Sequence, residues 1–438
     1  MRIHLGIDDT DSPSGGCTTK IATDVVLSLV RKGVAFTDYP NLIRLNPNVP
    51  WKTRGNAAVC IRMETVLNVQ SILEVTLDIV ERRCKFEEPE TDPAVVVLEG
   101  EVPSRVVRFS EDTLTQIMDP NEAISIARDA GATAIAYRTS RGIVGALAAI
   151  GAMLVNDHTY ELIAYRSEGF VGRPRLVDKE RVFEMDRQTF GFTFNNIDPE
   201  TGRVLLTPHG PDPILCGIRG ESPDAVRRAF QMLCIREPVE AWMIFRSNQG
   251  TDSHLVRELA VSQLKDNCTA VVTGRIREKP HTIRGGHVIF LLDDETGSVH
   301  CAAYEPTGKF RDVVRMLEPG DRVRVFGGVR PASKATPRTL NLEKLEVLEA
   351  VRCSTLRNPR CPTCGKSMKS AGRTQGFRCK RCGTHESSRV LIETPRLIRL
   401  GVYLPPPRAH RHLTKPHVRY GRERSETRIS PTTNWHYP

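Results

Sequence analysis

Apolar and polar positions along the first 267 residues follow the periods of short strands and amphipathic helices. The segment "RIHLGI" (2–7) predicts a strand, and "TKIATDVVLSLVRKG" (19–33) predicts a helix with one apolar stripe and a glycine stop. A helix at about 66–83 and the strand "AVVVLEG" follow. The same order recurs in "PILCGIRG", "SPDAVRRAFQML" and "EAWMIFRSNQG". This pattern predicts an α/β domain joined to a ferredoxin-like domain of split β-α-β units.

A further αβ stretch, from "PNEAISIARDAG" to "TYELIAYRS", lies between these units. We therefore predict that the two domains interleave. The α/β domain would take residues 1–61 and 119–197, and the ferredoxin-like domain residues 62–118 and 198–267. A serial order is the alternative.

The remaining chain changes character at residue 268. Residues 268–350 contain five strand patterns, with one short helix between the third and fourth, which is the order of an OB-fold barrel. Such barrels bind single-stranded nucleic acid or act as spacers, and the arginines here favour nucleic acid. A zinc ribbon at 351–400 and a basic tail at 401–438 complete the predicted multidomain, mixed α/β, α+β and all-β architecture.

Charge is distributed unevenly along the chain. The formal net charge is +10, and residues 351–438 hold 19 Lys and Arg against 4 Asp and Glu. This favours a polyanionic partner for the C-terminal part, although a solubilising tail has the same composition. No apolar run reaches the roughly 18 residues of a membrane helix, and the first residues lead directly into a strand. We therefore expect a cytoplasmic protein without a membrane span or signal peptide, and the mostly isolated cysteines agree with a reducing compartment.

Four cysteines form the most specific pattern in the sequence. Cys361 and Cys364 make one CxxC-G knuckle, and Cys379 and Cys382 make a second one after fourteen residues. Two such knuckles supply the four thiolates of a tetrahedral zinc site. All four positions of the metal are then filled, so the zinc should be structural.

An acidic cluster follows the first predicted strand directly. Carboxylates packed as densely as Asp8, Asp9 and Asp11 repel one another unless a cation compensates, and Mg²⁺ combines one or two carboxylates with phosphate oxygens. The following glycines and helix start would suit a phosphate, so we expect nucleotide contacts from Gly15, Gly16, Thr19 and Lys20. A capped surface turn would also use Asp, Ser and Gly here. The GK[ST] ending of a P-loop is missing.

Two polar loops extend the list of candidate residues. The segment "NPNVPWKTRGNAA" offers Lys52 and Arg54 to a phosphate or substrate, although an ordinary surface loop fits equally well. The segment "NNIDPETGRVLLTPHGPDPILCGIRGE" places polar side chains at predicted strand ends; its candidate substrate residues are Asn195, Asn196, Asp198, His209 and Asp212.

Together these features resemble one family, the archaeal tRNA(Ile) 2-agmatinylcytidine synthetases. The resemblance rests on "GIDDTDSPSGGCTT", on "NNID" and "TPHGPDPILCGIRGE", on the barrel and on the four cysteines, and it covers essentially the whole chain. It implies that the first domain is an ATP-dependent cytidine kinase-like domain. The enzyme would phosphorylate the C2 oxygen of the wobble cytidine in tRNA(Ile) with a CAU anticodon. Agmatine would then displace phosphate, ATP would end as AMP, and the anticodon would read AUA.

The resemblance also implies roles for the candidate residues. Asp8, Asp9 and Asp11 would hold Mg²⁺ on ATP, and Thr18 would accept or contact a phosphate. Agmatine is a dication, so Asp198 and Asp212 are candidate ligands for it, and His209 could take a proton from the attacking amine. The barrel, ribbon and tail would grip the tRNA.

Two other functions stay open on the sequence. In the first, the chain is a non-catalytic RNA-binding protein, and the acidic segment is only a turn. In the second, the acids serve a metal-dependent phosphatase or nuclease. Asp9-Thr10-Asp11 resembles the start of haloacid-dehalogenase-type phosphatases, but Pro13 departs from that motif and the remaining motifs are missing.

Overall fold

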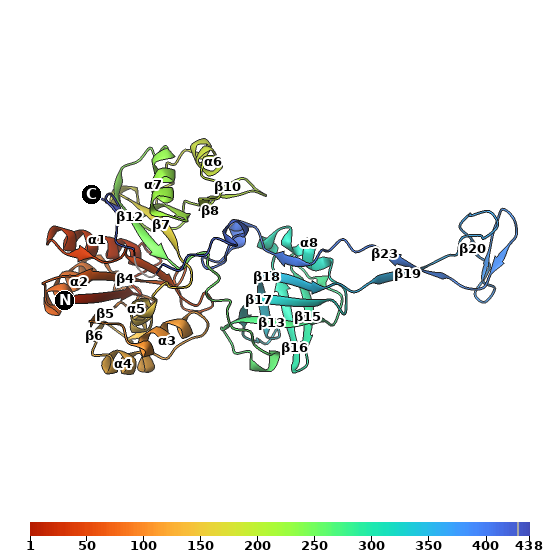
Figure 1. The fold of residues 1–438 in the computed structure, drawn as a ribbon, viewed down its shortest axis with the longest axis horizontal. Helices are drawn as coiled ribbons and strands as arrows, with labels where there is room; N and C mark the ends of the chain where they lie inside the picture. The colour runs from red at the N-terminus through yellow and green to blue at the C-terminus, as the bar shows by residue number, and fades with distance from the viewer. Residues whose placement is uncertain (427–428) are drawn as a thin grey trace.

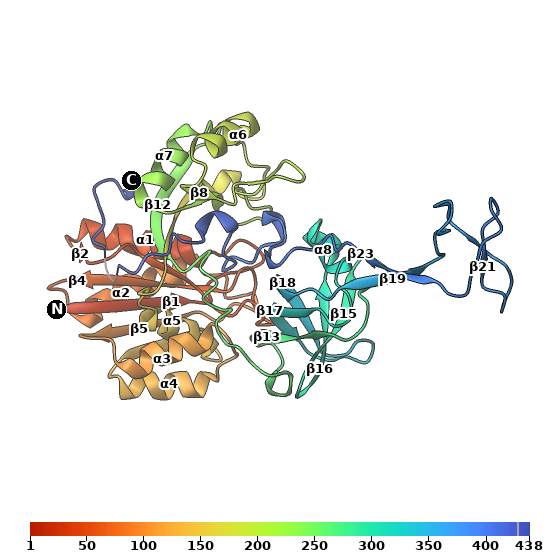
Figure 2. The same cartoon turned by 45° about the vertical axis from the view of Figure 1, so that its right-hand side comes forward.

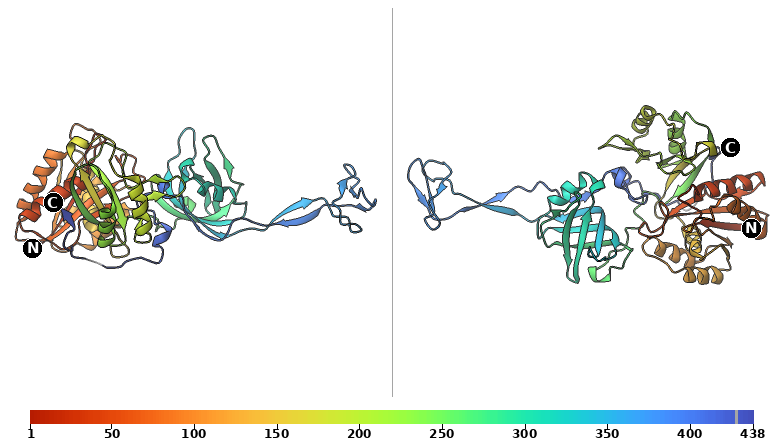
Figure 3. Two further views of the ribbon diagram at one scale, coloured as in Figure 1. Left: turned by 90° about the horizontal axis from the view of Figure 1, so that it is seen from above. Right: turned by 180° about the vertical axis from the view of Figure 1, so that it is seen from behind.

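A computed structural model describes residues 1–426 and 429–438. The molecule is elongated: an α/β body carries the N-terminus, a β-barrel follows, and a small domain lies at the far end of a two-stranded arm (Figure 1). Views from above and behind show the same extended arm, with the C-terminus back on the body (Figure 3). No helix in the described part of the chain is long and apolar enough to cross a membrane.

One large sheet forms the centre of the body, in the order β6-β5-β1-β4-β3-β12-β7-β11-β8, with β2 beside β4 and β25 beside β12. The pairing of β3 with β12 is parallel and joins its two halves. The strands are β1 (Arg2–Asp8), β2 (Ala35–Phe36), β3 (Asn41–Arg44), β4 (Ala57–Glu64), β5 (Ala94–Glu99), β6 (Thr133–Ala136), β7 (Thr159–Arg166), β8 (Thr193–Phe194), β11 (Ile214–Gly220), β12 (Val239–Ser247) and β25 (His436–Tyr437).

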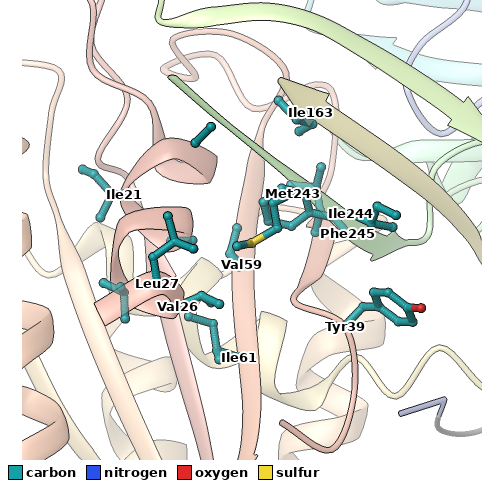
Figure 4. Packing of buried hydrophobic residues seen from close by; sticks show 14 of the residues in the cluster. Ile21, Val26, Leu27, Tyr39, Val59, Ile61, Ile163, Met243, Ile244 and Phe245 are labelled. Atoms are coloured by element: carbon teal, nitrogen blue, oxygen red, sulfur yellow. The ribbon is translucent and has the colours of Figure 1, made fainter. Parts of the chain in front are cut away.

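Alternate residues of these strands enter different cores, as the two-residue period requires. Val59 and Ile61 of β4 face the cluster under α1 and α2, whereas Ala58 and Cys60 face the cluster under α3, α4 and α5. Figure 4 shows the first cluster continuing from α1 to β7 and β12, and Figure 2 shows α3 and α4 together beside β5. The helices are α1 (Thr18–Arg31), α2 (Val69–Arg83), α3 (Ser104–Thr113), α4 (Pro120–Asp129), α5 (Arg141–Gly151), α6 (Lys179–Gln188) and α7 (Pro223–Met232).

The predicted interleaving differs from this strand order. Strand β5, which we placed in the second domain, pairs with β1 and β6 of the first half, and β7 pairs with β11 and β12 of the second. The apolar run of β5 is buried over Ala94–Leu98, so it needs covered faces on both sides and a central place in the sheet. The body therefore has the serial order: residues 1–151 build one half, and 159–247 build the other.

The barrel confirms the predicted OB-type order of three strands, a helix and two strands. Its own apolar core is separate from those of the body. The short β14 and the later β24 extend its sheet. The elements are β13 (Thr269–Ile276), β14 (His281–Thr282), β15 (Val288–Asp294), β16 (Gly297–Ala303), α8 (Phe310–Arg315), β17 (Arg322–Arg330), β18 (Thr339–Glu349) and β24 (Gly401–Tyr403).

The arm consists of the paired strands β19 (Cys353–Arg357) and β23 (Val390–Thr394), and it ends in the cysteine-rich domain. That domain has three short strands, β20 (Lys369–Ser370), β21 (Phe377–Arg378) and β22 (His385–Glu386). Its core is small: Cys361, Cys364 and Cys379 with Met368 and Phe377.

The basic tail, which we expected to grip the tRNA, is folded against the body. It returns to the body, where β25 pairs with β12. Arg419 is fully buried between Asp157 and Glu221, at 2.9 and 2.7 Å. Arg408 donates to Asp198 at 2.8 Å. Arg408 and Arg419 neutralise acids of the body, so they stabilise the fold and are not free to bind phosphates.

Candidate active site

The acidic loop lies between the end of β1 and the first turn of α1. The Cys17 side chain at the N-cap makes no capping hydrogen bond. Asp11 supplies one instead: its Oδ1 accepts from the Thr18 backbone N–H at 2.7 Å and from the Thr18 hydroxyl at 3.1 Å. Thr10 donates to the same hydroxyl at 3.0 Å. The Thr18 hydroxyl is therefore oriented, with a carboxylate placed to receive its proton.

Arg54 fixes Asp11 from the opposite side. Its Nη2 lies 2.9 Å from Asp11 Oδ1, and its Nε donates to Oδ2 at 3.2 Å. It also donates to the Gly16 carbonyl and lies 3.5 Å from Asp212. One guanidinium thus links the acidic loop, the 46–56 loop and the second half of the body.

Asp8 and Asp9 form the electrostatically unbalanced part of the cluster. Burial raises the pKa of Asp9 to about 6, even though Arg141 donates to it at 2.8 Å. Burial and the neighbouring Asp9 raise the pKa of Asp8 well above its usual value. Within the described residues, no salt bridge involves Asp8. Gly145 of α5 leaves room for this carboxylate, since a Cβ there would overlap it. A proton or a cation is required to neutralise this pair.

Arg141 and Asp92 belong to the site, although we did not predict them. Asp92 is almost fully buried and accepts hydrogen bonds from the backbone of Thr139 and Arg141 and from the Thr139 hydroxyl. It thereby holds the start of α5 where Arg141 reaches Asp9. Each contact spans more than 40 residues, so no local sequence pattern could reveal it.

A cavity of about 700 Å³ opens beside these groups. Asp8, Asp9, Asp11, Thr18 and Arg141 line one wall, and the loops at 49–57 and 113–120 line the others. Lys52 and Arg54 are in this lining. The cavity has room for a nucleotide together with a small substrate.

Several predicted phosphate contacts lie elsewhere. Thr18 and Lys20 are two residues apart on a helix, so they point about 200° apart, and Thr18 faces the cavity. Lys20 pairs instead with Asp24 at 2.6 Å and Glu240 at 3.0 Å. The Thr19 hydroxyl contacts Cys17 within the core. Gly16 is needed for close packing, since a Cβ there would lie 2.6 Å from the Thr10 carbonyl, and Gly15 has φ 125° in the same turn.

The five candidate substrate residues of the second half do not line this cavity. Asp198 is buried and saturated by Arg408 and two backbone N–H groups. Asp212 lies between Arg54 and Arg175, and His209 is hydrogen bonded to Arg203. The Asn195 amide donates to His410, and that of Asn196 donates to Asp186. Asp212 is thus the only one of the five that contacts the acidic site, through Arg54.

One complete metal-ligand set occurs in the described part of the chain. The four cysteine sulfurs all lie within 4.8 Å of one another, with Cys361 and Cys382 at 3.2 Å and Cys364 and Cys379 at 3.4 Å. A tetrahedron of zinc–sulfur bonds of about 2.3 Å needs sulfurs at this spacing. The residues fit zinc, as predicted. The three aspartates do not converge on one point in the same way, because Asp11 is taken by Thr18 and Arg54.

Family models match four segments of the chain. They are a TiaS TCKD domain (4–68), a TiaS FLD domain (140–254), an OB-fold nucleic acid binding domain (270–348) and a TiaS C-terminal zinc ribbon domain (358–398). A tRNA(Ile) 2-agmatinylcytidine synthetase TiaS from Pyrococcus horikoshii is 43% identical over 422 residues, which cover 95% of this chain and 97% of that protein. The protein of that name from Methanopyrus kandleri is 43% identical over 94% and 96% of the two chains.

Solved structures agree over the same length. A complex of TiaS with its isoleucine tRNA and ATP has a TM-score of 0.86 and 36% identity, with 98% of this chain and 99% of that chain covered. A complex of TiaS with the same tRNA, AMPCPP and agmatine has a TM-score of 0.84 and 36% identity, with 96% and 97% covered. The similarity therefore includes every domain described above.

Proposed function

We infer the activity from the fact that this chain belongs to the family of tRNA(Ile) 2-agmatinylcytidine synthetases. It is an ATP-dependent tRNA-modifying enzyme that joins agmatine to the wobble cytidine of the isoleucine tRNA with a CAU anticodon, forming agmatidine. The observation that carries this assignment is the one cavity that holds Asp8, Asp9, Asp11 and Thr18 together. No feature of the comparisons favours a non-catalytic RNA-binding protein, a phosphatase or a nuclease.

ATP binds, on our proposal, with its phosphates against the acidic loop and the first turn of α1. Asp8 and Asp9 would hold Mg²⁺ there, since the two buried carboxylates face a single cation, Arg141. The ion, when bound, neutralises charge on the phosphates. Arg141 and Arg54 keep the acids in place.

Thr18 is our proposed phosphate acceptor or phosphate contact. Its hydroxyl donates to Asp11, so a lone pair on the oxygen is free to attack a phosphorus atom. The Asp11 carboxylate is placed to accept the hydroxyl proton. Phosphorylation of the cytosine C2 oxygen makes that oxygen a leaving group. Attack by the agmatine amine at C2 then breaks the C2–O bond and releases that group as inorganic phosphate. Because ATP ends as AMP, its α–β bond is also broken, and hydrolysis releases the second phosphate.

Agmatine recognition needs carboxylate or carbonyl oxygens for two cationic ends. Among the five candidates, Asp212 lies nearest to the ATP site, through Arg54, but Arg54 and Arg175 already neutralise it. Asp198 is disfavoured because Arg408 already neutralises it. Asn195, Asn196 and His209 remain candidates for the surrounding pocket.

The cysteine-rich ribbon is the part best prepared to hold tRNA. Within the described residues, no carboxylate pairs with its basic side chains, namely Lys366, Lys369, Arg373, Arg378, Lys380 and Arg381. In the barrel, by contrast, Arg275 and Arg322 share Glu349, and Arg324 pairs with Glu346. An unpaired cation breaks no ion pair when it binds a phosphate. The ribbon should therefore supply more of the salt-dependent affinity for tRNA than the barrel does. We place this enzyme in the cytoplasm, where its tRNA substrate is found.

Incubation with the isoleucine tRNA, ATP, Mg²⁺ and labelled agmatine tests the function directly. We expect label in full-length tRNA and one AMP for each agmatine. Shortened RNA would indicate a nuclease, and phosphate release without label would indicate a phosphatase. A transcript with guanosine in place of the target cytidine is the matched control and should take no label.

A further inference from the structure

A second cavity, of about 250 Å³, adjoins the active site on the other side of the 46–56 loop. That loop and β3 form one wall, and the returning tail at 410–413 forms the other. Four basic side chains line it: Arg44, Lys52, Arg54 and Arg411. Among the residues that the structure describes, no aspartate or glutamate lines it. The positive charge of this lining would be balanced by a bound anion.

Two of the four cations have internal partners. Arg54 is committed to Asp11, and Arg44 donates to the Gly55 carbonyl at 2.7 Å and lies 3.8 Å from Glu161. The side chains of the other two, Lys52 and Arg411, make no salt bridge or hydrogen bond within the described residues. Burial and the neighbouring Arg411 lower the pKa of Lys52. The Nε of Arg44 is buried and also lacks a hydrogen-bond partner there.

The tail wall is fixed in position by specific contacts. Arg219 donates to His412 Nδ1 at 3.1 Å, and the Gly250 backbone N–H donates to the His412 carbonyl at 2.9 Å. His412 also lies close against Gly55, where a Cβ would come within 2.5 Å of its ring. Burial and three nearby arginines keep the pKa of His412 well below its usual value, so the ring is neutral. The cavity is thus preformed. Arg411 helps to lower the pKa of Glu343, but that carboxylate lies outside the cavity lining and is bonded to His254.

We propose that this cavity binds a phosphate group between Lys52 of the active-site loop and Arg411 of the tail. The proposal rests on the proposed function and deepens it, because Lys52 and Arg54 line both cavities. A phosphate here sits beside the ATP site without touching Asp8 or Asp9. Two sources supply this chemistry: the RNA backbone next to the target cytidine, and the phosphate or pyrophosphate released from ATP.

The test uses the full-length protein with Lys52→Met and Arg411→Met. The matched control is Lys32→Met, which removes an exposed charge at the far end of α1. Arg411→Lys keeps the positive charge and should therefore bind like the parent. Agmatine incorporation gives the KM for tRNA, and calorimetry with inorganic phosphate and with pyrophosphate gives their affinities without RNA. A tRNA with one methylphosphonate linkage beside the target cytidine removes a single backbone charge.

Loss of either cation should weaken the affinity for the ligand that supplies the phosphate about tenfold, as expected for a charge-assisted hydrogen bond. Lys32→Met should change that affinity less than about twofold. With a backbone phosphate, the methylphosphonate raises the KM of the parent but not that of Arg411→Met. With a released phosphate, calorimetry detects binding to the parent and its loss in Arg411→Met.

Parent-like affinity for tRNA, phosphate and pyrophosphate in both variants would overturn the proposal. Failure of the parent to incorporate agmatine would instead contradict the proposed function, and the binding measurements would still decide the role of the cavity.

Discussion

The cysteine ribbon and the acidic loop are both sites where the chain gathers anionic ligands for a cation, yet they are built differently. The ribbon brings four sulfurs to one point with a core of only a few residues, and none of the body side chains that the structure describes takes part. In the acidic loop, Asp9 and Asp11 are already held by Arg141 and Arg54, while Asp8 is left with its charge unmatched. The first site is complete in its ligands and serves the fold. The acidic loop leaves room for a substrate, and its carboxylates are held in position by side chains from other parts of the body.

The largest effect should come from removing zinc from the ribbon. Cys379→Ser or a chelator should unfold residues 358–398, since metal binding of about 10 kcal/mol or more supplies the folding free energy of such small domains. Hydrogen exchange should show full loss of protection there and unchanged protection in the body. A ribbon that stays protected without zinc would show that its small core suffices.

The tail offers the next test, because the body depends on it and the ribbon does not. Arg419→Met leaves Asp157 and Glu221 buried without their cation, and we expect a loss of about 3–5 kcal/mol in the free energy of unfolding of the body. Arg424→Met, at a more exposed arginine 3.9 Å from Glu221, should cost about 1 kcal/mol or less. Denaturant unfolding followed by tryptophan fluorescence measures both variants. Equal losses would contradict the structural role of Arg419.

Asp11 tests whether the capping hydrogen bonds serve catalysis. Asp11→Asn keeps the shape of the loop but weakens the acceptor for the Thr18 hydroxyl, so kcat for agmatine incorporation should fall about 10²–10³-fold. Thr10→Val, which removes only the donor to Thr18, should lower kcat much less. Similar losses in both variants would mean that hydroxyl orientation matters and the Asp11 carboxylate does not.

The smallest effect concerns pH and magnesium. Because the folded-state pKa of Asp9 is raised from 3.8 to about 6, the folded protein binds protons more tightly, and this contribution to stability falls as the pH rises through that window. Mg²⁺ must displace the proton at low pH. We therefore expect a larger Mg²⁺-induced rise in Tm at about pH 7.5 than at about pH 5, by a few degrees, and none at either pH in Asp8→Asn. A pH-independent rise would place the ion elsewhere.

The sequence was informative where the signal is local. The β1 strand, the acidic loop, the barrel order and the cysteine knuckles are each encoded within a few dozen residues, and the structure confirms these elements. Helix α6 gives little apolar signal because it buries only Val182 and Met185, and it was not predicted.

Long-range contacts were beyond reach of the pattern. The pairing of Arg141 with Asp9 spans 132 residues, and that of Arg408 with Asp198 spans 210. Both depend on how separate elements pack, which also explains why Lys20 and Asp198 looked available for ligands and are instead satisfied internally. A basic tail can thus pack against the body as part of the fold when acidic side chains of the body pair with it.

Asp9→Asn provides the most direct test of the central claim, that the acidic loop is the ATP end of an agmatine-transferring enzyme. The measurement pairs AMP formation and agmatine incorporation with the Kd for the isoleucine tRNA, in the parent and in the variant. We predict that AMP and incorporated agmatine are both lost, while the tRNA affinity stays within about twofold, because the ribbon lies at the far end of the arm, away from the body that carries this loop (Figure 1). Parent-like AMP formation in Asp9→Asn would contradict the account.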